Sequence, residues 1–502
     1  MNPLWTLLPP LAAIPFILFF GEARRNLREG SIVVAGIVLV LINVSIYRAT
    51  LAGETLESGE LRLLHATAGV TGGADGTVYA LELAAEPMGV MFGLLASFLW
   101  IVTTFYSVGY MRGHAEANQT RFYTCFAIAL SAVMAAAYSA NLLTLFVAYE
   151  VLTLSTVPLV THAGNDASRK AGRVYLGILL ATSIGLFLPA IIWTSIAAGS
   201  LEFVPGGVLG AAGLGGGALA LLLGLFMFGI GKAAVMPLHR WLPAAMVAPT
   251  PVSALLHAVA VVKTGVFSLL KIVTYTFGID TLSGSGAAAW LLPFAAFTVI
   301  AASVVAFTKD NLKARLAYST IGQLSYIVLA ALLATTMSIT GGAMHIVMHA
   351  FGKITLFFCA GALIVFAHKT LISELDGYGR RMPVTMGAFF IGALGIIGLP
   401  PAGGLWSKAL IVGGSLDTGT VFWAIVLLVS TLLNIAYLMP IPIRAFFRPL
   451  PGVAPGEQVA RAEAALPSLA AIVVTATVTV LLFLYPAPLV ELLGLIRWRA
   501  ES

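Results

Sequence analysis

Long apolar stretches, separated by short polar connections, repeat along the whole chain. A helix needs about 20 apolar residues to cross the hydrocarbon core of a bilayer. Most of the stretches reach that length, and the longest connection, at about 52–78, is too short for a soluble catalytic domain. We therefore expect an all-α polytopic membrane protein with about fourteen membrane-crossing helices. These are predicted at residues 3–20, 31–51, 79–108, 121–138, 141–161, 174–198, 213–236, 251–275, 288–307, 318–337, 341–367, 385–412, 420–445 and 468–488.

Lysine and arginine residues are concentrated on alternate connections. The odd-numbered connections hold 18 of them, whereas the even-numbered connections hold only Arg62 clearly inside a loop. Arg48 and Lys271 are assigned to helix edges, and Arg497 and Arg499 to the tail. The positive-inside rule places the odd connections in the cytoplasm. We therefore expect a multi-pass protein of the cell inner (plasma) membrane with both termini on the outer side.

The composition agrees with this assignment and excludes other classes of protein. Of the 502 residues, 59% are hydrophobic and only 10% are charged, against about 25% charged in soluble domains. The chain is therefore neither a soluble globular domain nor a disordered one. Two cysteines, Cys125 and Cys359, lie in apolar stretches, which excludes an iron–sulfur site and a disulfide framework. We expect no cofactor, no metal and no nucleic-acid partner.

Five charged side chains remain at membrane depth once loops, helix edges and the tail are set aside. They are Glu150, Lys232, Lys263, Lys353 and Lys408. A charge at the centre of a bilayer costs about 2.5–3.5 kcal/mol on insertion scales. Any single lysine could snorkel to the interface or form a structural ion pair. Four such lysines and one glutamate in one chain favour an ion or proton path instead.

Three titratable side chains share one face of the predicted helix 341–367. His345, His349 and Lys353 are spaced four residues apart, and four residues turn a helix by about 400°. We favour a proton relay, because imidazole titrates near neutral pH. A metal site is an alternative, although no third ligand is visible and a lysine lies beside the pair. A pair of hydrogen-bonded core histidines is another alternative.

A further histidine and lysine lie on the predicted helix 251–275. His257 and Lys263 are six residues apart, which places them about 120° from each other on a continuous helix. They could contact different neighbours along one line of polar groups. For His257 alone, a hydrogen-bonded core position is the alternative.

Glycine and proline interrupt two of the predicted helices beside their lysines. In one, Gly229 and Gly231 closely precede Lys232. In the other, the run GLPPAGG at 398–404 precedes Lys408. Proline removes a helical hydrogen bond and glycine permits unwinding, and broken helices at membrane depth are typical of transport sites. Lys232 and Lys408 are 176 residues apart, or five predicted helices. An odd number of crossings per repeat inverts the second copy, so we expect inverted repeats; an ordinary proline kink is the alternative.

Four longer motifs carry a resemblance to a known family. They occupy residues 237–267, 309–327, 345–363 and 372–409, the last ending in GLPPAGGLWSKA. In this order they resemble the antiporter-like subunits of respiratory complex I and their relatives in Mrp-type cation/proton antiporters and membrane-bound hydrogenases. Since the chain ends at Ser502, we expect no lateral helix after the last crossing, and the size and pattern are most similar to the D-type Mrp subunit.

The resemblance implies a fold with two inverted five-helix repeats. The N-terminal helices 1–3 would occupy residues 1–120, the first repeat 121–275 and the second repeat 288–445. Residues 446–502 would hold the last helix and the tail. The interrupted helices would be the seventh and the twelfth.

The resemblance also implies one site, a line of titratable groups that passes protons at mid-membrane depth. Glu150 would pair with Lys232, and His257 and Lys263 would connect the two halves. His345, His349 and Lys353 would form the relay of the second half. Lys408 would end the line, at a position where some family members have glutamate. These roles are carried over from the family, motif by motif.

Three functions are compatible with this line. The chain could be a proton or Na⁺/H⁺ translocating subunit of a multisubunit cation/proton antiporter. It could be the same module in a redox-driven complex, such as an NADH:quinone oxidoreductase or a membrane-bound hydrogenase, and only then part of an enzyme. It could also be a membrane anchor of an inorganic carbon uptake complex. In each case we expect other membrane subunits as partners, because the deep lysines outnumber the deep acids.

Overall fold

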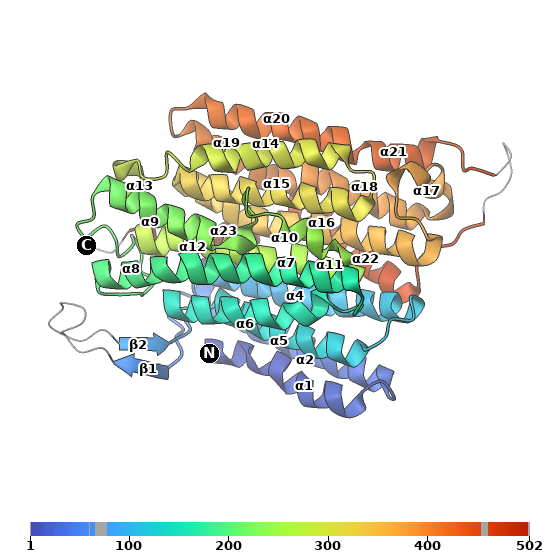
Figure 1. Ribbon diagram of the computed structural model, residues 1–502, viewed down its shortest axis with the longest axis horizontal. Coiled ribbons are helices and arrows are strands. Elements are labelled where there is room, and N and C mark those ends of the chain that lie inside the picture. The colour runs from blue at the N-terminus through green and yellow to red at the C-terminus, as the bar shows by residue number, and fades with distance from the viewer. Residues whose placement is uncertain (1, 60, 66–77, 453–459, 500–502) are drawn as a thin grey trace.

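The computed structural model describes residues 2–59, 61–65, 78–452 and 460–499. It shows a bundle of helices that run side by side (Figure 1). A two-stranded antiparallel sheet, β1 (Leu61–His65) and β2 (Val78–Leu81), lies at one end of the bundle. The predicted all-α membrane fold is therefore confirmed.

Within the described residues, eleven helices are long and apolar enough to cross a membrane, and three shorter apolar helices accompany them. Each predicted segment overlaps one of these fourteen helices. In the first half of the chain the elements are η1 (Pro3–Thr6), α1 (Leu8–Phe20), α2 (Arg25–Leu51), α4 (Pro87–Gly113), α5 (Gln119–Ala137), α6 (Leu142–Val160), α7 (Asp166–Thr182), η2 (Ser183–Phe187), α8 (Leu188–Ala198), α9 (Gly216–Gly229), η3 (Gly231–Ala233), α10 (Trp241–Ala244) and η4 (Ala245–Val247).

The second half has the same character, with long helices joined by short turns. Its elements are α11 (Thr250–Ala258), α12 (Val261–Ile272), η5 (Val273–Phe277), α13 (Ile279–Ser285), α14 (Leu292–Thr308), α15 (Leu312–Leu333), α16 (Thr336–Ala367), η6 (Ile372–Glu374), α17 (Tyr378–Arg381), α18 (Pro383–Ile397), α19 (Gly404–Leu416), α20 (Val421–Leu438), α21 (Pro440–Phe447), α22 (Leu466–Leu484) and α23 (Ala487–Gly494).

Local sequence explains several of the helix boundaries. Asn141, Asn165 and Asn311 each precede a helix, and each side-chain oxygen accepts a hydrogen bond from a backbone N–H of the first turn, which is the preferred role of asparagine at an N-cap. The predicted start of the third crossing at residue 79 is wrong. The helix α4 begins at Pro87, because a proline at the first position suits a helix start and residues 78–81 belong to β2.

Besides the two interrupted crossings that the sequence predicts, the described residues contain a further one. The predicted breaks occur between α9 and α10 and between α18 and α19. The third divides the predicted helix 251–275 into α11 and α12 at Val259 and Ala260. No glycine or proline marks this place in the sequence, so the continuous helix expected there is wrong.

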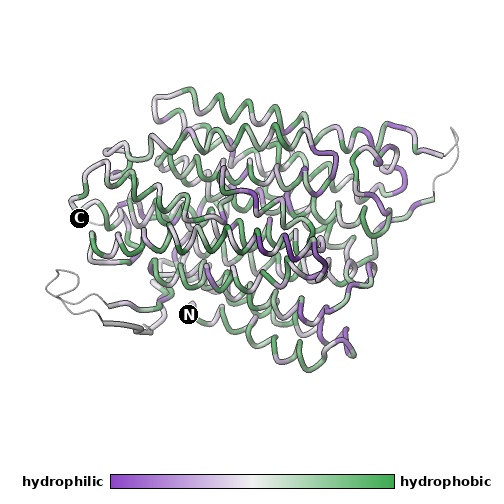
Figure 2. Tube along the Cα trace, in the orientation of Figure 1, coloured by the Kyte–Doolittle hydropathy of each residue, from purple (hydrophilic) through white to green (hydrophobic). Residues whose placement is uncertain are grey.

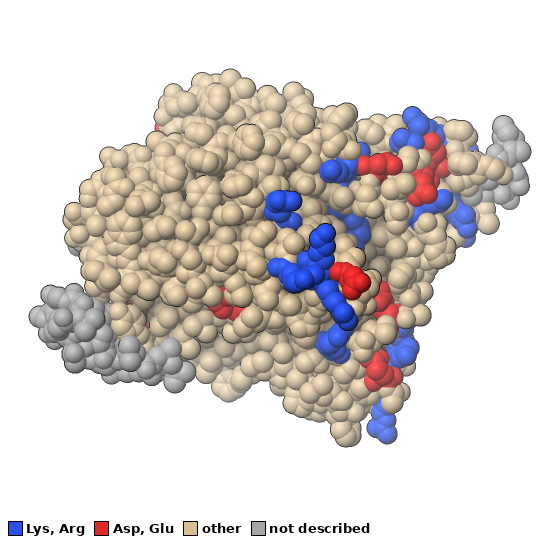
Figure 3. Space-filling model, viewed as in Figure 1, with Lys and Arg blue, Asp and Glu red and all other residues tan. Residues whose placement is uncertain are grey.

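The helices that carry most of the predicted site lie in the interior of the bundle. The most apolar window of α11–η5 is 100% buried and that of α15 is 94% buried, against 28% for α2. Charged side chains gather instead at one end of the molecule (Figure 3), where the chain is also most hydrophilic (Figure 2). Both termini lie toward the opposite end (Figure 1). This separation of charge is what the alternating connections predict, whereas the side of the membrane on which each end lies stays a prediction.

Candidate functional site

The first interrupted crossing holds Lys232 in the centre of the protein. The helix α9 ends at Gly229, and Lys232 lies in the turn η3 with its side chain fully buried. A Cβ atom at Gly231 would lie 2.3 Å from Oγ1 of Thr182, so only glycine fits at this approach. The indole of Trp241 donates a hydrogen bond to the carbonyl of Gly231 at 3.0 Å, and this bond satisfies a backbone group that the break exposes.

Neutral oxygens of α6 hold the Lys232 ammonium. It donates to the carbonyl of Tyr149 at 2.8 Å and to the hydroxyl of Thr153, and it lies 3.1 Å from the centre of the Tyr149 ring. The hydroxyl of Tyr149 in turn accepts a hydrogen bond from the backbone N–H of Lys232 at 3.1 Å. The break and α6 are therefore joined by three contacts around one charge.

Glu150 lies beside this site without touching the ammonium. Among the ion pairs within 4.0 Å that the described residues form, none joins Glu150 to Lys232, and the buried Oε1 of Glu150 has no hydrogen-bond partner. Its helix neighbours Val147 and Leu154 are 37% and 57% exposed, so Glu150 is directed toward the outer face of the bundle. The ion pair predicted between Glu150 and Lys232 is therefore not formed in this structure.

A direct contact links the two halves of the site. Nζ of Lys263 on α12 lies 2.6 Å from Nδ1 of His349 on α16, and both side chains are buried. The helix α12 also packs directly on the first break, because a Cβ at Gly265 would lie 2.5 Å from the carbonyl carbon of Lys232. Lys263 therefore contacts the second half of the site directly, while its role as the connecting residue stays a prediction.

His257 lies at the end of α11 and has no hydrogen-bond partner on either ring nitrogen. Its ring packs against Phe357, with the ring centres 4.6 Å apart. The angle of 120° that we expected between His257 and Lys263 does not apply, because the break at 259–260 separates their helices. A buried polar ring without a partner is what an internal water site requires.

The helix α16 presents its three titratable side chains to different partners. His345 bonds through Nδ1 to Ser407 at 2.9 Å and through Nε2 to Gln323 at 3.1 Å. The ring of His349 lies 5.9 Å from that of His345, and its Nε2 has no partner. Lys353 donates to Ser319 at 2.8 Å. The three side chains therefore contact different partners, and the described residues contain no group of three His, Cys, Asp or Glu side chains that could hold a metal ion.

The second interrupted crossing ends the line at Lys408. The ammonium donates to the carbonyl of Ile397, the last residue of α18, at 3.0 Å, and it lies 4.6 Å from the centre of the Tyr326 ring. Gly398 has a φ of +86°, and this left-handed conformation turns the chain away from α18. The helix break therefore supplies a carbonyl that binds the lysine.

The structure adds residues that the sequence interpretation did not single out. Ser407 joins His345 to the helix of Lys408, and Ser319 joins Lys353 to the hydroxyl of Tyr437, which donates to it at 2.9 Å. Hydroxyl side chains in apolar helices usually bond to their own backbone, so nothing in the sequence distinguishes these two. Lys271, which we assigned to a helix edge, is a fifth fully buried lysine.

Comparison with known proteins gives the chain a family context. The family described as "NADH:quinone oxidoreductase/Mrp antiporter, TM" matches residues 139–434. The chain is 31% identical to NADH-quinone oxidoreductase subunit N of Desulforudis audaxviator over 397 residues, which cover 78% of this chain and 76% of that one. It is 31% identical to NAD(P)H-quinone oxidoreductase chain 5 of Synechocystis over 373 residues, 67% of this chain but 51% of the relative. The chain therefore spans only about half of some relatives.

Two solved structures share the fold over nearly the whole chain. One is a chain of the membrane-bound sulfane sulfur reductase, an archaeal respiratory membrane complex, with a TM-score of 0.81, 21% identity and coverage of 97% of this chain and 95% of that one. The other is a chain of the Mrp complex from Dietzia, with a TM-score of 0.81, 19% identity and coverage of 98% and 95%. At this identity the likeness concerns the fold.

Proposed function

Because the chain belongs to the NADH:quinone oxidoreductase/Mrp antiporter transmembrane family, we propose that it is the proton-translocating membrane subunit of a multisubunit cation/proton antiporter. Its path is the line of titratable side chains at the two helix breaks and between them, all of which are buried except Glu150. These are Glu150, Lys232, His257, Lys263, His345, His349, Lys353 and Lys408.

The contact between Lys263 and His349 is the observation that carries the proposal. An amine and an imidazole 2.6 Å apart share a proton, since the ammonium can donate it and the neutral ring nitrogen can accept it. It is costly to bury an amine and an imidazole that can each become charged. A core with a purely structural role would avoid that cost. Their direct contact therefore supports proton transfer between the two halves.

Water is the second component of the proposed path. Glu150, His257 and His349 each have a buried polar atom without a protein partner, and such atoms are ordinarily satisfied by ordered water. Water at these three places would connect groups that do not touch in the structure. The proton would then pass from the Lys232 region through Lys263 and His349 to His345 and Lys408.

The distance between Glu150 and Lys232 would control the first step. A nearby carboxylate favours the charged form of an ammonium, whereas desolvation disfavours it. With the carboxylate apart, only neutral oxygens hold the Lys232 ammonium, and the proton is easier to release. When Glu150 approaches, the ammonium is stabilised again. A movement of the Glu150 side chain can thus allow Lys232 to take up or to release a proton.

The position of Glu150 also supports a partner subunit. A carboxyl group at the outer face of the bundle, between the exposed side chains of Val147 and Val151, would meet lipid unless another protein covers it. Other membrane subunits are therefore the expected partners, with protons, and sodium in an antiporter, as the transported ions. We place the protein in the inner (plasma) membrane with both termini on the outer side.

A redox-driven complex is the second candidate for the assembly. The observation that favours it is the sequence similarity to subunits of NADH- or NAD(P)H-quinone oxidoreductases. In that case the proton line would be the same, and the driving force would come from another subunit. A membrane anchor in a carbon uptake complex is the remaining hypothesis, and it alone would tolerate loss of the buried lysines.

The experiment is proton transport by the whole complex in membrane vesicles, followed with a pH-sensitive dye. Lys263→Met should reduce transport at least about tenfold, the lower range for loss of one proton-transfer group, with the complex still assembled. The matched control is Lys369→Met, because Lys369 is 30% exposed at the charged end and pairs with Glu374. Transport at the control level by Lys263→Met would overturn the proposal and favour the anchor.

A further inference from the structure

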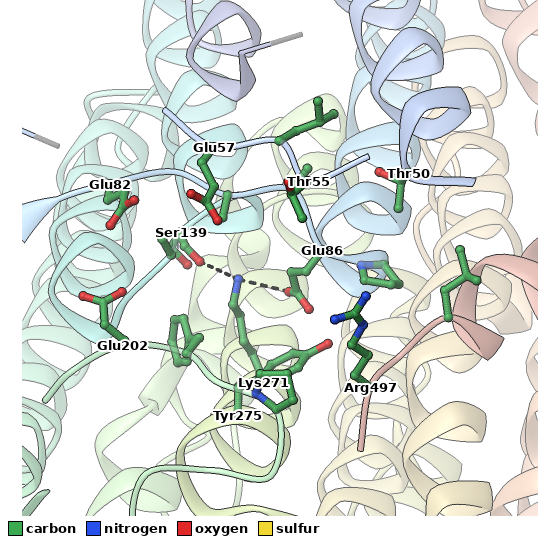
Figure 4. Close-up of a pocket in the computed structure, with 18 of the residues that line it drawn as sticks. Thr50, Thr55, Glu57, Glu82, Glu86, Ser139, Glu202, Lys271, Tyr275 and Arg497 are labelled. Carbon is green, nitrogen blue, oxygen red and sulfur yellow. Dashed lines mark hydrogen bonds and ion pairs between the residues drawn. The ribbon is translucent and has the colours of Figure 1, made fainter. Parts of the chain in front are cut away.

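An acidic pocket opens at the end of the bundle opposite to the concentration of lysine and arginine. Its volume is about 350 Å³ (Figure 4). It is built by the end of α2, the segment before α4, the turn after α5, the turn after α8, the α12–η5 helix and the C-terminal tail. Five glutamates line it against two basic side chains, Lys271 and Arg497. The glutamates are Glu54, Glu57, Glu82, Glu86 and Glu202.

The base of the pocket is a buried ion pair. Nζ of Lys271 lies 3.0 Å from Oε1 of Glu86 and donates a hydrogen bond to the carbonyl of Ser139 at 2.6 Å (Figure 4). The Lys271 side chain is fully buried, and that of Glu86 is 18% exposed. Both charged groups are therefore buried at the base of the pocket, because both carboxylate oxygens of Glu86 are also inaccessible to water, and only the rest of the Glu86 side chain is exposed.

A polar stripe leads from this pair toward the proposed proton line. On α12, Thr264, Ser268 and Lys271 follow one another at spacings of four and three residues, which places them on one face of the helix. The hydroxyl of Thr264 is fully buried and has no hydrogen-bond partner. Thr264 directly follows Lys263, and eight residues of helix, about 12 Å, separate Lys263 from Lys271. An unsatisfied hydroxyl between two buried lysines marks a place for water.

We propose that this pocket is the outer portal of the proton path and that Lys271 and Glu86 pass the proton between the pocket and the central line. The inference rests on the proposed function. In the outward direction, the Lys271 ammonium gives a proton to the Glu86 carboxylate, which leaves a neutral amine and a carboxylic acid. Glu86 then releases the proton to water in the pocket. The amine takes up the next proton from the α12 stripe, which restores the ion pair, and the same steps reversed describe uptake.

The surrounding charges favour this role over a purely structural pair. Four further glutamates face the same pocket, and their negative field attracts hydronium and other cations to its mouth. The other titratable side chains in the pocket wall, besides Lys271 and the five glutamates, are Arg497 and the phenol of Tyr275. A structural pair alone needs neither an acidic mouth nor an opening to water.

Two variants of Lys271 distinguish a relay from a structural contact. Lys271→Met removes the titratable group, and Lys271→Arg keeps the ion pair but cannot release a proton. In the whole complex in vesicles, both should reduce proton transport at least about tenfold at unchanged assembly, with Lys369→Met as the control. If Lys271→Arg transports normally, the pair is structural and the proposal is overturned.

Chemical blocking tests the portal itself. In a chain that carries Cys125→Ser and Cys359→Ser, Thr55→Cys introduces a thiol at the exposed rim of the pocket. A positively charged, membrane-impermeant thiol reagent added to the outer side should label it and reduce transport at least about tenfold. Thr418→Cys, also exposed but outside the pocket wall, should be labelled without loss of transport. Labelling of Thr55→Cys with full transport would overturn the portal.

The variant Lys263→Met, measured in parallel, separates this inference from the proposed function. If Lys263→Met abolishes transport while the Lys271 variants do not affect it, the central line stands and the portal lies elsewhere. If Lys263→Met transports normally as well, the proposed function itself has failed.

Discussion

At the scale of single residues, the charges of the site are held by neutral groups rather than by opposite charges. Lys232 is bound by a carbonyl and a hydroxyl of α6, and Lys408 by the last carbonyl of α18. Burying an unpaired charge is costly, and the neutral partners of these lysines offset that cost only in part. This is the property that a proton carrier needs.

The pair Glu150 and Lys232 should act as one unit. We predict that Glu150→Ala and Lys232→Ala each reduce proton transport at least about a hundredfold, the range for loss of a general acid or base, while the complex still assembles. The double variant should be no worse than either single one, because groups that act together are not additive. Transport is measured with a pH dye and assembly by co-purification. Losses that multiply in the double variant would contradict a shared step.

Lys408 should be replaceable by another titratable group. Its ammonium binds the carbonyl of Ile397 and lies near Thr431, and a protonated carboxyl group can donate to the same carbonyl. We therefore predict that Lys408→Glu retains at least about ten times the transport of Lys408→Ala. Equal losses at equal protein levels would indicate a specific need for the lysine.

Much of the site was predictable residue by residue, because charge in an apolar helix is a strong signal. Lys232, Lys263, His349 and Lys408 stand out in the sequence for this reason, and the structure places them at the breaks or in contact across the core. Lys271 was missed, since its place near the end of a predicted helix suggested a snorkelling side chain. Burial by neighbouring segments is a tertiary property that the local sequence does not contain.

At the scale of elements, the helix breaks depend on close packing. A Cβ at Gly404 would lie 2.0 Å from the carbonyl oxygen of Gly395, so the second break brings two backbones together at a point where a side chain has no room. Glycine and proline predicted this break and the one at Lys232. The break between α11 and α12 has no such residue, so the local sequence does not mark it.

At the charged end, hydrogen bonds of Asp376 with Arg444 and Arg448 connect the segment after α16 to α21 and its end. Asp376 accepts hydrogen bonds from Arg444 at 2.8 Å and 3.3 Å and from Arg448 at 3.3 Å. The Arg444 guanidinium, and then Arg448, hold the pKa of Asp376 below its ordinary value, although slight burial opposes the shift. The carboxylate thus stabilises the folded state above the unfolded pKa of about 3.9, and this stabilisation is lost as the pH falls through the lower folded pKa.

We therefore predict that Asp376→Asn lowers the free energy of unfolding by about 1 kcal/mol at neutral pH. The difference from the unchanged protein should disappear as the pH falls through the lowered pKa of Asp376. Thermal unfolding of the detergent-solubilised protein measures both. The control is Asp417→Asn, an exposed aspartate at the other end of the bundle. If Asp376→Asn is equally destabilising at low pH, the side chain of Asp376 stabilises the fold by packing and not by its charge.

At the scale of the whole molecule, the bundle separates a charged end from an end that bears the termini and the acidic pocket. That the chain is a helical membrane protein was predictable, because the bilayer fixes the length of each apolar stretch. The order in which the helices pack was not, since an apolar face does not specify its neighbour.

The membrane topology follows from the distribution of lysine and arginine. We predict that reporters fused after Arg169 and after Lys313 lie in the cytoplasm, and that a reporter at the C-terminus lies outside. The reason is that the first two belong to the odd connections, which hold 18 basic residues, and such loops stay inside. Reporters active only on one side of the membrane measure this. A cytoplasmic C-terminus would contradict the assignment.

The central claim is that a proton passes through the buried lysines, and Lys263→Arg tests it most directly. Arginine keeps the positive charge and the donors next to His349, but it does not deprotonate in proteins. In the assembled complex in vesicles, with Lys369→Arg as the control, the account predicts that Lys263→Arg transports protons at no more than about a tenth of the unchanged rate. Normal transport by Lys263→Arg would show that Lys263 need not release its proton, and would contradict the account.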